Sequence, residues 1–159
     1  MNEPSTRSRR ATRTRQGGAA AVEAAIVMVL LVTFLTFPVF YARIFWHYTV
    51  ANKAAQDAAR YLSTVSAREM ASRTLSKAAG DLAIEIARTE IAELGPETRM
   101  DAIVVYCGVA PCGSNAGITP STVKVTVTLH IFDTFFGVVD TGRDGWTLTA
   151  DVTLPYVGT

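Results

Sequence analysis

The sequence predicts an α+β protein with a long N-terminal helix that is first apolar and then amphipathic, a second helix, and a small antiparallel sheet of three strands. Three patterns support this prediction: a charge-free apolar run, apolar residues at helical spacing after it, and a C-terminal region of alternating apolar and polar residues. The 159 residues leave room for one modest domain besides a membrane segment. We expect four parts: a basic leader at 1–18, a transmembrane helix at 19–43, an amphipathic stalk helix at 44–64, and an exported α+β domain at 65–159.

The membrane segment is predicted from the run between Ala24 and Ala42, which contains nineteen residues and no charge. At about 1.5 Å per residue, such a helix approaches the thickness of the hydrocarbon layer. Five arginines precede the run, whereas the first positive charge after it is the single Arg43. The positive-inside rule therefore places the N-terminus in the cytoplasm and the remainder of the chain outside the inner membrane, in a single pass.

A cleaved secretory signal is the competing interpretation of the same run. The apolar core of a signal peptide is normally shorter and ends in small residues at a cleavage site. This run instead ends among aromatic side chains, which suit a membrane–water interface: Phe40, Tyr41, Phe45 and Trp46. Beside a span, the arginines of the leader are explained by topology and contact with anionic lipid, so we expect no nucleic-acid partner.

The stalk helix is predicted from apolar residues that recur every four positions. The expected buried stripe is Trp46, Val50, Ala54, Ala58 and Leu62, with Ala51, Ala55 and Ala59 beside it. Pro38 lacks the amide hydrogen of other residues, and it could bend the helix within the span.

A second helix is expected from Ser66 to about Leu94. Ser66 and Glu69 have the spacing of a capping box, and Gly95 with the proline after it supplies a stop. Gly80 could divide this helix into two. The expected buried stripe is Met70, Leu75, Ala79, Leu82, Ile86 and Ala87.

Three strands are expected, at 102–106, 123–131 and 146–156. Apolar and polar residues alternate in the last two, which predicts half-buried strands, whereas the first is a short apolar run before the cysteine turn. A three-stranded meander needs a cover for its apolar face, and the second helix, the alanine-rich face of the stalk, or both could supply it. The long connection before the last strand contains Phe135, Phe136 and Val138, which belong either to the core or to an exposed patch for a partner. The core is the favoured alternative.

The two cysteines, Cys107 and Cys112, flank a turn that contains Gly108 and Pro111. Because they lie in the part expected outside the cytoplasm, a disulfide is favoured. A metal site would need more than two thiolates, and the two histidines, His47 and His130, have no ligand spacing to the pair. We therefore expect no metal.

Glu23 is the one charged residue in the apolar run that starts at Gly17, and a carboxylate at the edge of a membrane is costly without a reason. One explanation is that Glu23 complements the dipole at the start of the helix. The other comes from the run Arg15 to Glu23, which resembles the processing site of type IV-like prepilins: a basic leader ending in glycine, followed by a helix with glutamate at its fifth position.

This resemblance implies that a membrane prepilin peptidase cuts between Gly18 and Ala19. Glycine at the scissile bond leaves the backbone uncovered for the protease. Cleavage would make Ala19 a positively charged amine, and the Glu23 carboxylate of a neighbouring subunit would neutralise it inside an apolar bundle, setting the axial register of assembly.

The similarity extends to the TadE-like family. Residues 18–23, the apolar helix, and the alanine-rich stretch 54–60 ending in Arg60 are similar to the signature of that family, over roughly a third of the chain. Two positions depart from the usual pattern, since Ala24 follows the glutamate and the proline lies late in the span. The resemblance implies a pilin-like fold and a minor pseudopilin of a tight-adherence pilus or secretion system.

The resemblance also implies partners and a location. The partners would be the major pilin, other pseudopilins, an inner-membrane secretion platform, the prepilin peptidase and membrane lipid. The C-terminal domain would be periplasmic or extracellular, with the subunit either in the pilus or at its base.

For catalysis, the sequence offers no nucleophile elbow, zinc-protease helix, phosphate-binding loop or dinucleotide fingerprint. Asp140, Asp144 and Gly145 fit an ordinary polar turn better than a cation-binding loop. We expect no enzyme, catalytic residue or cofactor. The main alternative is an uncleaved bitopic protein whose exported domain binds an envelope component; a small envelope hydrolase comes third, with no residue to nominate.

Overall fold

A computed structural model of the chain describes four stretches, at residues 17–95, 98–114, 117–132 and 141–158. The arginines of the leader lie outside these stretches, as do Pro96 and Asp140. The apolar residues Phe135, Phe136 and Val138 also lie outside them, so the choice between core and partner patch stays a prediction.

The long N-terminal helix is confirmed. Helix α1 runs from Gly17 to Thr64 over 48 residues, and the chain divides into two compact units, the first ending at Phe37 and the second beginning at Pro38. In the described part of the first unit, nearly every side chain is exposed, and the most apolar stretch of the helix has a mean hydropathy of 2.4. By length and composition, this helix can cross a membrane.

In the second unit, α1 turns a face of small side chains toward the core. Ala51, Ala54, Ala55, Ala58, Ala59 and Leu62 are fully buried. Small side chains let the helix backbone lie close to the layer beneath it. The expected stripe is wrong at its start, because Trp46 is 51% exposed whereas its neighbour His47 is 1% exposed.

The second helical region consists of α2 (Ala67–Ala71), α3 (Arg73–Ile91) and the short 3₁₀ turn η1 (Ala92–Leu94). The predicted capping box is confirmed, since the Ser66 hydroxyl accepts from the backbone N–H of Glu69 while the Glu69 carboxylate accepts from the backbone N–H of Ser66. The helix divides at Ser72, whose backbone is extended, and not at Gly80, which lies inside α3.

The face that α3 buries differs from the expected one. Leu75 and Leu82 are 47% and 50% exposed, and the buried residues of α3 are Ser76, Ala79, Gly80, Ala83, Ala87 and Ile91. The expected stripe followed the largest apolar side chains. Ala79 and Ala87 of the expected stripe are buried, but the face is rotated toward small residues, because the cysteine turn packs on α3 with no room for a larger side chain at Gly80.

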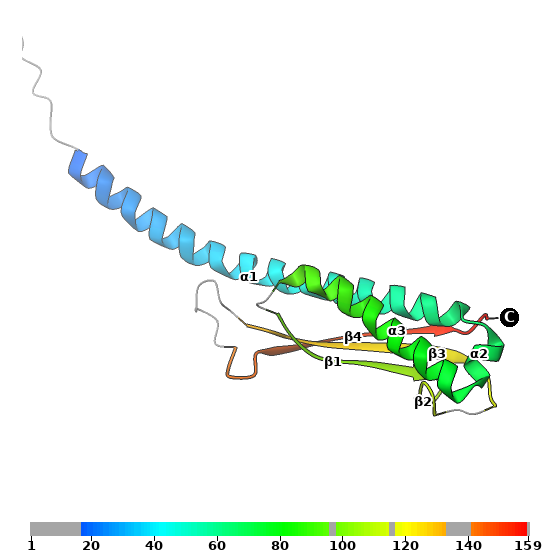
Figure 1. The fold of residues 1–159 in the computed structure, drawn as a ribbon. Helices are drawn as coiled ribbons and strands as arrows, with labels where there is room; N and C mark the ends of the chain where they lie inside the picture. Colours follow the sequence, from blue (N-terminus) through cyan, green and yellow to red (C-terminus); the bar gives the residue numbers. More distant parts are fainter. Residues whose placement is uncertain (1–16, 96–97, 115–116, 133–140, 159) are drawn as a thin grey trace, which may run out of the picture. The chain divides into compact units, whose positions relative to one another are not determined.

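The sheet contains four strands: β1 (Thr98–Cys107), β2 (Ala110–Pro111), β3 (Thr122–Ile131) and β4 (Trp146–Pro155). They are antiparallel neighbours in the order β2-β1-β3-β4 (Figure 1). The prediction of three strands is therefore wrong by one. The turn after Cys107 folds back so that Ala110 and Pro111 pair with β1, and a strand of two residues is too short to show alternation.

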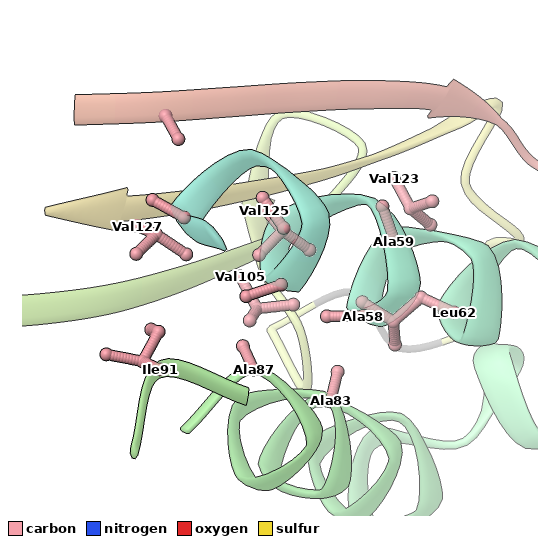
Figure 2. Packing of buried hydrophobic residues seen from close by; sticks show 14 of the residues in the cluster. Ala58, Ala59, Leu62, Ala83, Ala87, Ile91, Val105, Val123, Val125 and Val127 are labelled. Carbon is pink, nitrogen blue, oxygen red and sulfur yellow. The ribbon is translucent and has the colours of Figure 1, made fainter. Parts of the chain in front are cut away.

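The core of the second unit lies between one face of the sheet and both helices, so both expected covers are used. On β3, every second side chain from Val123 to Ile131 is buried. Figure 2 shows Val123, Val125 and Val127 pointing to the same region as Ala59 of α1 and Ala87 of α3. The other face of the sheet bears mostly threonines and charged residues, which follows from the period-2 pattern.

The last residues of the chain contact the end of α1. The Tyr156 hydroxyl donates to the carbonyl oxygen of Val65 over 2.6 Å, and the backbone N–H of Val157 donates to the carbonyl of Ser63 over 3.0 Å. At Gly158, a Cβ atom would collide with the Val65 carbonyl oxygen. The helix terminus therefore receives partners for carbonyls that its own backbone cannot satisfy.

Candidate functional site

The expected processing site lies at the start of α1. Gly18, Ala19 and Glu23 are all exposed, and a Cβ atom added at Gly18 would meet nothing within 4 Å. Ala19 and Glu23 are four residues apart, which places them on the same side of the helix. The helix dipole acts most strongly within the first turn of a helix. Glu23 lies six residues after Gly17, the first residue of α1, and so lies beyond that turn. Among the described residues, Glu23 makes no ion pair.

The surface that follows the expected processing site is apolar on all sides. Between Ala24 and Ala42, Thr36 and Phe40 are the only buried residues, and the exposed fractions include 65% at Met28 and 76% at Phe34. Monomeric proteins rarely expose contiguous apolar surface of this extent to water. The arrangement therefore suits contact with lipid or with other apolar helices.

A second candidate site is the cysteine turn at the opposite end of the sheet from the start of β4. The structure pairs Cys107 with Cys112 in a disulfide, with the Cα atoms 4.8 Å apart. Gly108 and Gly113 adopt positive φ angles of 77° and 86°, which glycine tolerates better than other residues. Cys107 itself is 1% exposed, so the bridge is part of the core at one end.

The cysteine turn packs directly on α3. A Cβ atom at Gly80 would lie 2.9 Å from the Cβ atom of Cys112, and one at Gly113 would lie 2.7 Å from that of Lys77. The buried Ser76 hydroxyl accepts from the backbone N–H of Gly113 over 3.2 Å. Sequence reasoning missed this contact, although a glycine inside a helical pattern is a known signal of close approach.

A third feature missed from the sequence is the buried His47. Its Nδ1 atom lies 2.7 Å from the carbonyl oxygen of Arg43, and its Nε2 atom lies 2.9 Å from Oγ1 of Thr98. Because a carbonyl oxygen only accepts, Nδ1 donates to the carbonyl of Arg43, and Nε2 shares a second hydrogen bond with the hydroxyl of Thr98. The histidine therefore joins α1 to the first residue of β1. As a separate observation, no group of three or more His, Cys, Asp or Glu side chains within the described residues could hold a metal ion.

An ion pair joins the two helices on their outer side. Nζ of Lys53 lies 3.2 Å from the carboxylate of Glu90, and the hydrogen bond and charge of that carboxylate raise the pKa of Lys53. Lys53 is well exposed, so the pair adds little stability, although it links α1 and α3 at these two positions.

The outer face of the sheet carries an open hollow of about 430 Å³. It is lined by an ion pair between Lys124 and Asp151, whose charged atoms lie 3.4 Å apart. A hydrogen bond from the hydroxyl of Thr126 and then the Lys124 ammonium lower the pKa of Asp151. Its other lining residues are Val104, Tyr106, Gly108 and Val109. A nucleophile paired with a histidine base is therefore not part of this hollow.

The comparison with protein families bears on the first of these features. Residues 18–60 match the family described as TadE-like protein. The TadE-like match starts at the expected processing glycine, includes the apolar surface, and ends with the alanine face of α1, so the resemblance inferred from the sequence is confirmed over about a quarter of the chain. It associates the chain with a component of Tad pili. No curated protein and no solved structure matched the chain.

Proposed function

We propose that this chain is a minor pseudopilin or assembly component of a Tad-type pilus or secretion system and not an enzyme. It is anchored in the inner membrane by residues 19–43, with a cytoplasmic leader at 1–18 and an exported domain that follows. The observation that carries the proposal is that the TadE-like match begins at Gly18 and coincides with one helix that is first apolar on every side and then packed into a domain.

The proposal assigns a cleavage to the start of α1. A prepilin peptidase cuts between Gly18 and Ala19, where the structure has open space around the glycine. The new amine of Ala19 and the carboxylate of Glu23 then lie on one exposed side of an otherwise apolar helix. Unpaired charges are costly in an apolar bundle, so two subunits associate with the amine of one beside the carboxylate of the other.

The partners follow from the same surface. The apolar face between residues 24 and 42 contacts lipid before assembly and other pilin helices, of the major pilin or of other pseudopilins, after it. The exported domain remains available for the secretion platform. A reporter that is active only outside the cytoplasm, fused at the C-terminus through a flexible linker, tests the orientation.

Two substitutions separate cleavage from assembly. Gly18→Val should leave the leader attached, because a β-branched side chain crowds the scissile peptide, whereas the matched control Gly17→Val should still be cut. Glu23→Ala should be cut yet fail to co-purify with pilins, and Glu23→Asp, which keeps the charge, should recover part of the association.

The readouts are the intact mass of the protein from its native host and its co-purification with pilins. A protein that begins at Met1 in the presence of active prepilin peptidase would contradict the cleavage. In that case the uncleaved bitopic protein, with an exported domain that binds an envelope component, becomes the better explanation.

A further inference from the structure

The row of residues at one end of the sheet is tied to α1 on both sides. Thr98, Ile131 and Trp146 are partners in adjacent strands and form this row. Thr98 contacts His47 through the hydrogen bond of 2.9 Å described above. At the other end of the row, the indole of Trp146 packs edge to face on Phe40, with ring centroids 5.5 Å apart and planes at 81°. We call this end of the second unit its base.

The contact between Trp146 and Phe40 fixes the height of the base along α1, relative to the expected membrane span. Phe40 lies two residues before the end of the charge-free run, and Arg43 is the first charge after it. At the helical rise, Phe40 is only about 4.5 Å along α1 from Arg43. Phe40, which contacts the indole, is 6% exposed, whereas the exposed fraction of Trp146 is 40%. The start of β4 therefore lies at the level where the expected span ends.

Aromatic rings surround α1 at this level. Tyr41, Phe45 and Tyr48 have the spacing of one helix stripe and are 50%, 68% and 46% exposed. Trp46 is 51% exposed and points away from that stripe by its position in the helix. On the remaining side, where the sheet packs, the exposed aromatic ring is supplied by Trp146 of β4. Such rings concentrate at the headgroup level of bilayers, where one part is apolar and the other wet.

We propose that the base of the exported domain is a membrane-contacting surface, with Trp146 inserted at the lipid headgroup level as the contribution of β4 to the aromatic belt of α1. The partner is the outer interface of the inner membrane. The inference rests on the membrane span of the proposed function, and it adds that the domain lies on the bilayer surface before assembly.

Tryptophan fluorescence tests this contact directly, because the chain has two tryptophans. The full chain with Trp46→Phe keeps Trp146 as its one fluorophore. It is reconstituted in phosphatidylcholine vesicles that contain lipids brominated near the headgroup end or near the methyl end of the acyl chains. Bromine close to the headgroup should reduce the emission roughly twofold, and more than deep bromine does, because the indole lies near the interface.

A matched control places the fluorophore at the far end of β4. The full chain with Trp46→Phe, Trp146→Phe and Val157→Trp carries its indole just beyond the end of β4, roughly 35 Å away at the strand rise, where valine is 62% exposed. This variant should be insensitive to both brominated lipids and should be quenched by aqueous iodide.

The outcomes separate the inference from the proposed function. Retention of the Trp46→Phe protein in vesicles after an alkaline wash, together with quenching by shallow bromine, supports the surface contact. Retention with iodide quenching equal to that of the Val157→Trp control overturns the contact and leaves the span intact. Release of the protein by the alkaline wash overturns both.

Discussion

Replacing Leu62 by alanine should destabilise the second unit far more than the same replacement at Leu82. Leu62 is fully buried among the alanines of α1 and the strands, whereas Leu82 is 50% exposed on α3. Removing a buried leucine side chain costs about 3 kcal/mol, since the lost transfer free energy is joined by a cavity. At Leu82 no closed cavity forms, and only about half of the side chain is buried. Its replacement should therefore lower the free energy of unfolding by about 1 kcal/mol or less.

The two variants can be compared by urea unfolding of the full chain in detergent micelles, followed by tryptophan fluorescence. With a slope of about 2 kcal/mol per M, Leu62→Ala should lower the midpoint by roughly 1.5 M and Leu82→Ala by less than about 0.5 M. Both residues are leucines in helices, so intrinsic helix propensity cancels in the comparison. Equal shifts, or a larger one at Leu82, would refute the packing of α3 through its small residues.

Three further predictions concern contacts at the end of the sheet opposite the base. Replacing both Cys107 and Cys112 by serine should lower the free energy of unfolding by about 2 kcal/mol, and alkylation of both thiols in non-reduced exported protein would show that no bridge forms. Gly80→Ala should destabilise by about 1 kcal/mol despite the better helix propensity of alanine, because the new methyl group meets the fixed Cβ of Cys112; a stabilised variant in thermal unfolding would contradict this contact. Burial, and then the charge of a nearby glutamate, raises the pKa of Tyr156 in the folded protein. The stability that this residue contributes is therefore complete below the unfolded pKa of about 10 and is lost as pH rises through the folded pKa. Tyr156→Phe should remove that alkaline loss from the pH dependence of stability, and an unchanged profile would assign the loss to other groups.

The elements with strong periodicity could be predicted from the sequence. The strand at 123–131 alternates without a break, and the structure buries every second side chain of it. The helix start at Ser66 was predictable because a capping box is local chemistry between residues three apart. The apolar helix and the TadE-like segment could also be recognised, since both are properties of contiguous sequence.

What could not be predicted depends on contacts between distant segments. The periodicity of α3 allows two adjacent faces, one with Leu75 and Leu82 and one mostly with small residues, and the close approach of the cysteine turn to Gly80 selects the second. The same holds for the candidate site at the base, where the pairing of Phe40 with Trp146 joins residues more than a hundred positions apart. No local pattern encodes such a contact.

The attachment of the chain's last residues to the end of α1 constrains the order in which the domain can fold. The hydrogen bond from Tyr156 to Val65 joins residues 91 positions apart, whereas α1, α2 and α3 make contacts within a much shorter stretch. Local contacts form early, and closing a long loop costs entropy before the contact is gained. During synthesis from the N-terminus, α1, α2 and α3 can therefore form first, but their sheet-facing alanines stay uncovered until β3 and β4 have emerged. The interval between these two events is when the domain is most exposed to aggregation or to capture by another subunit.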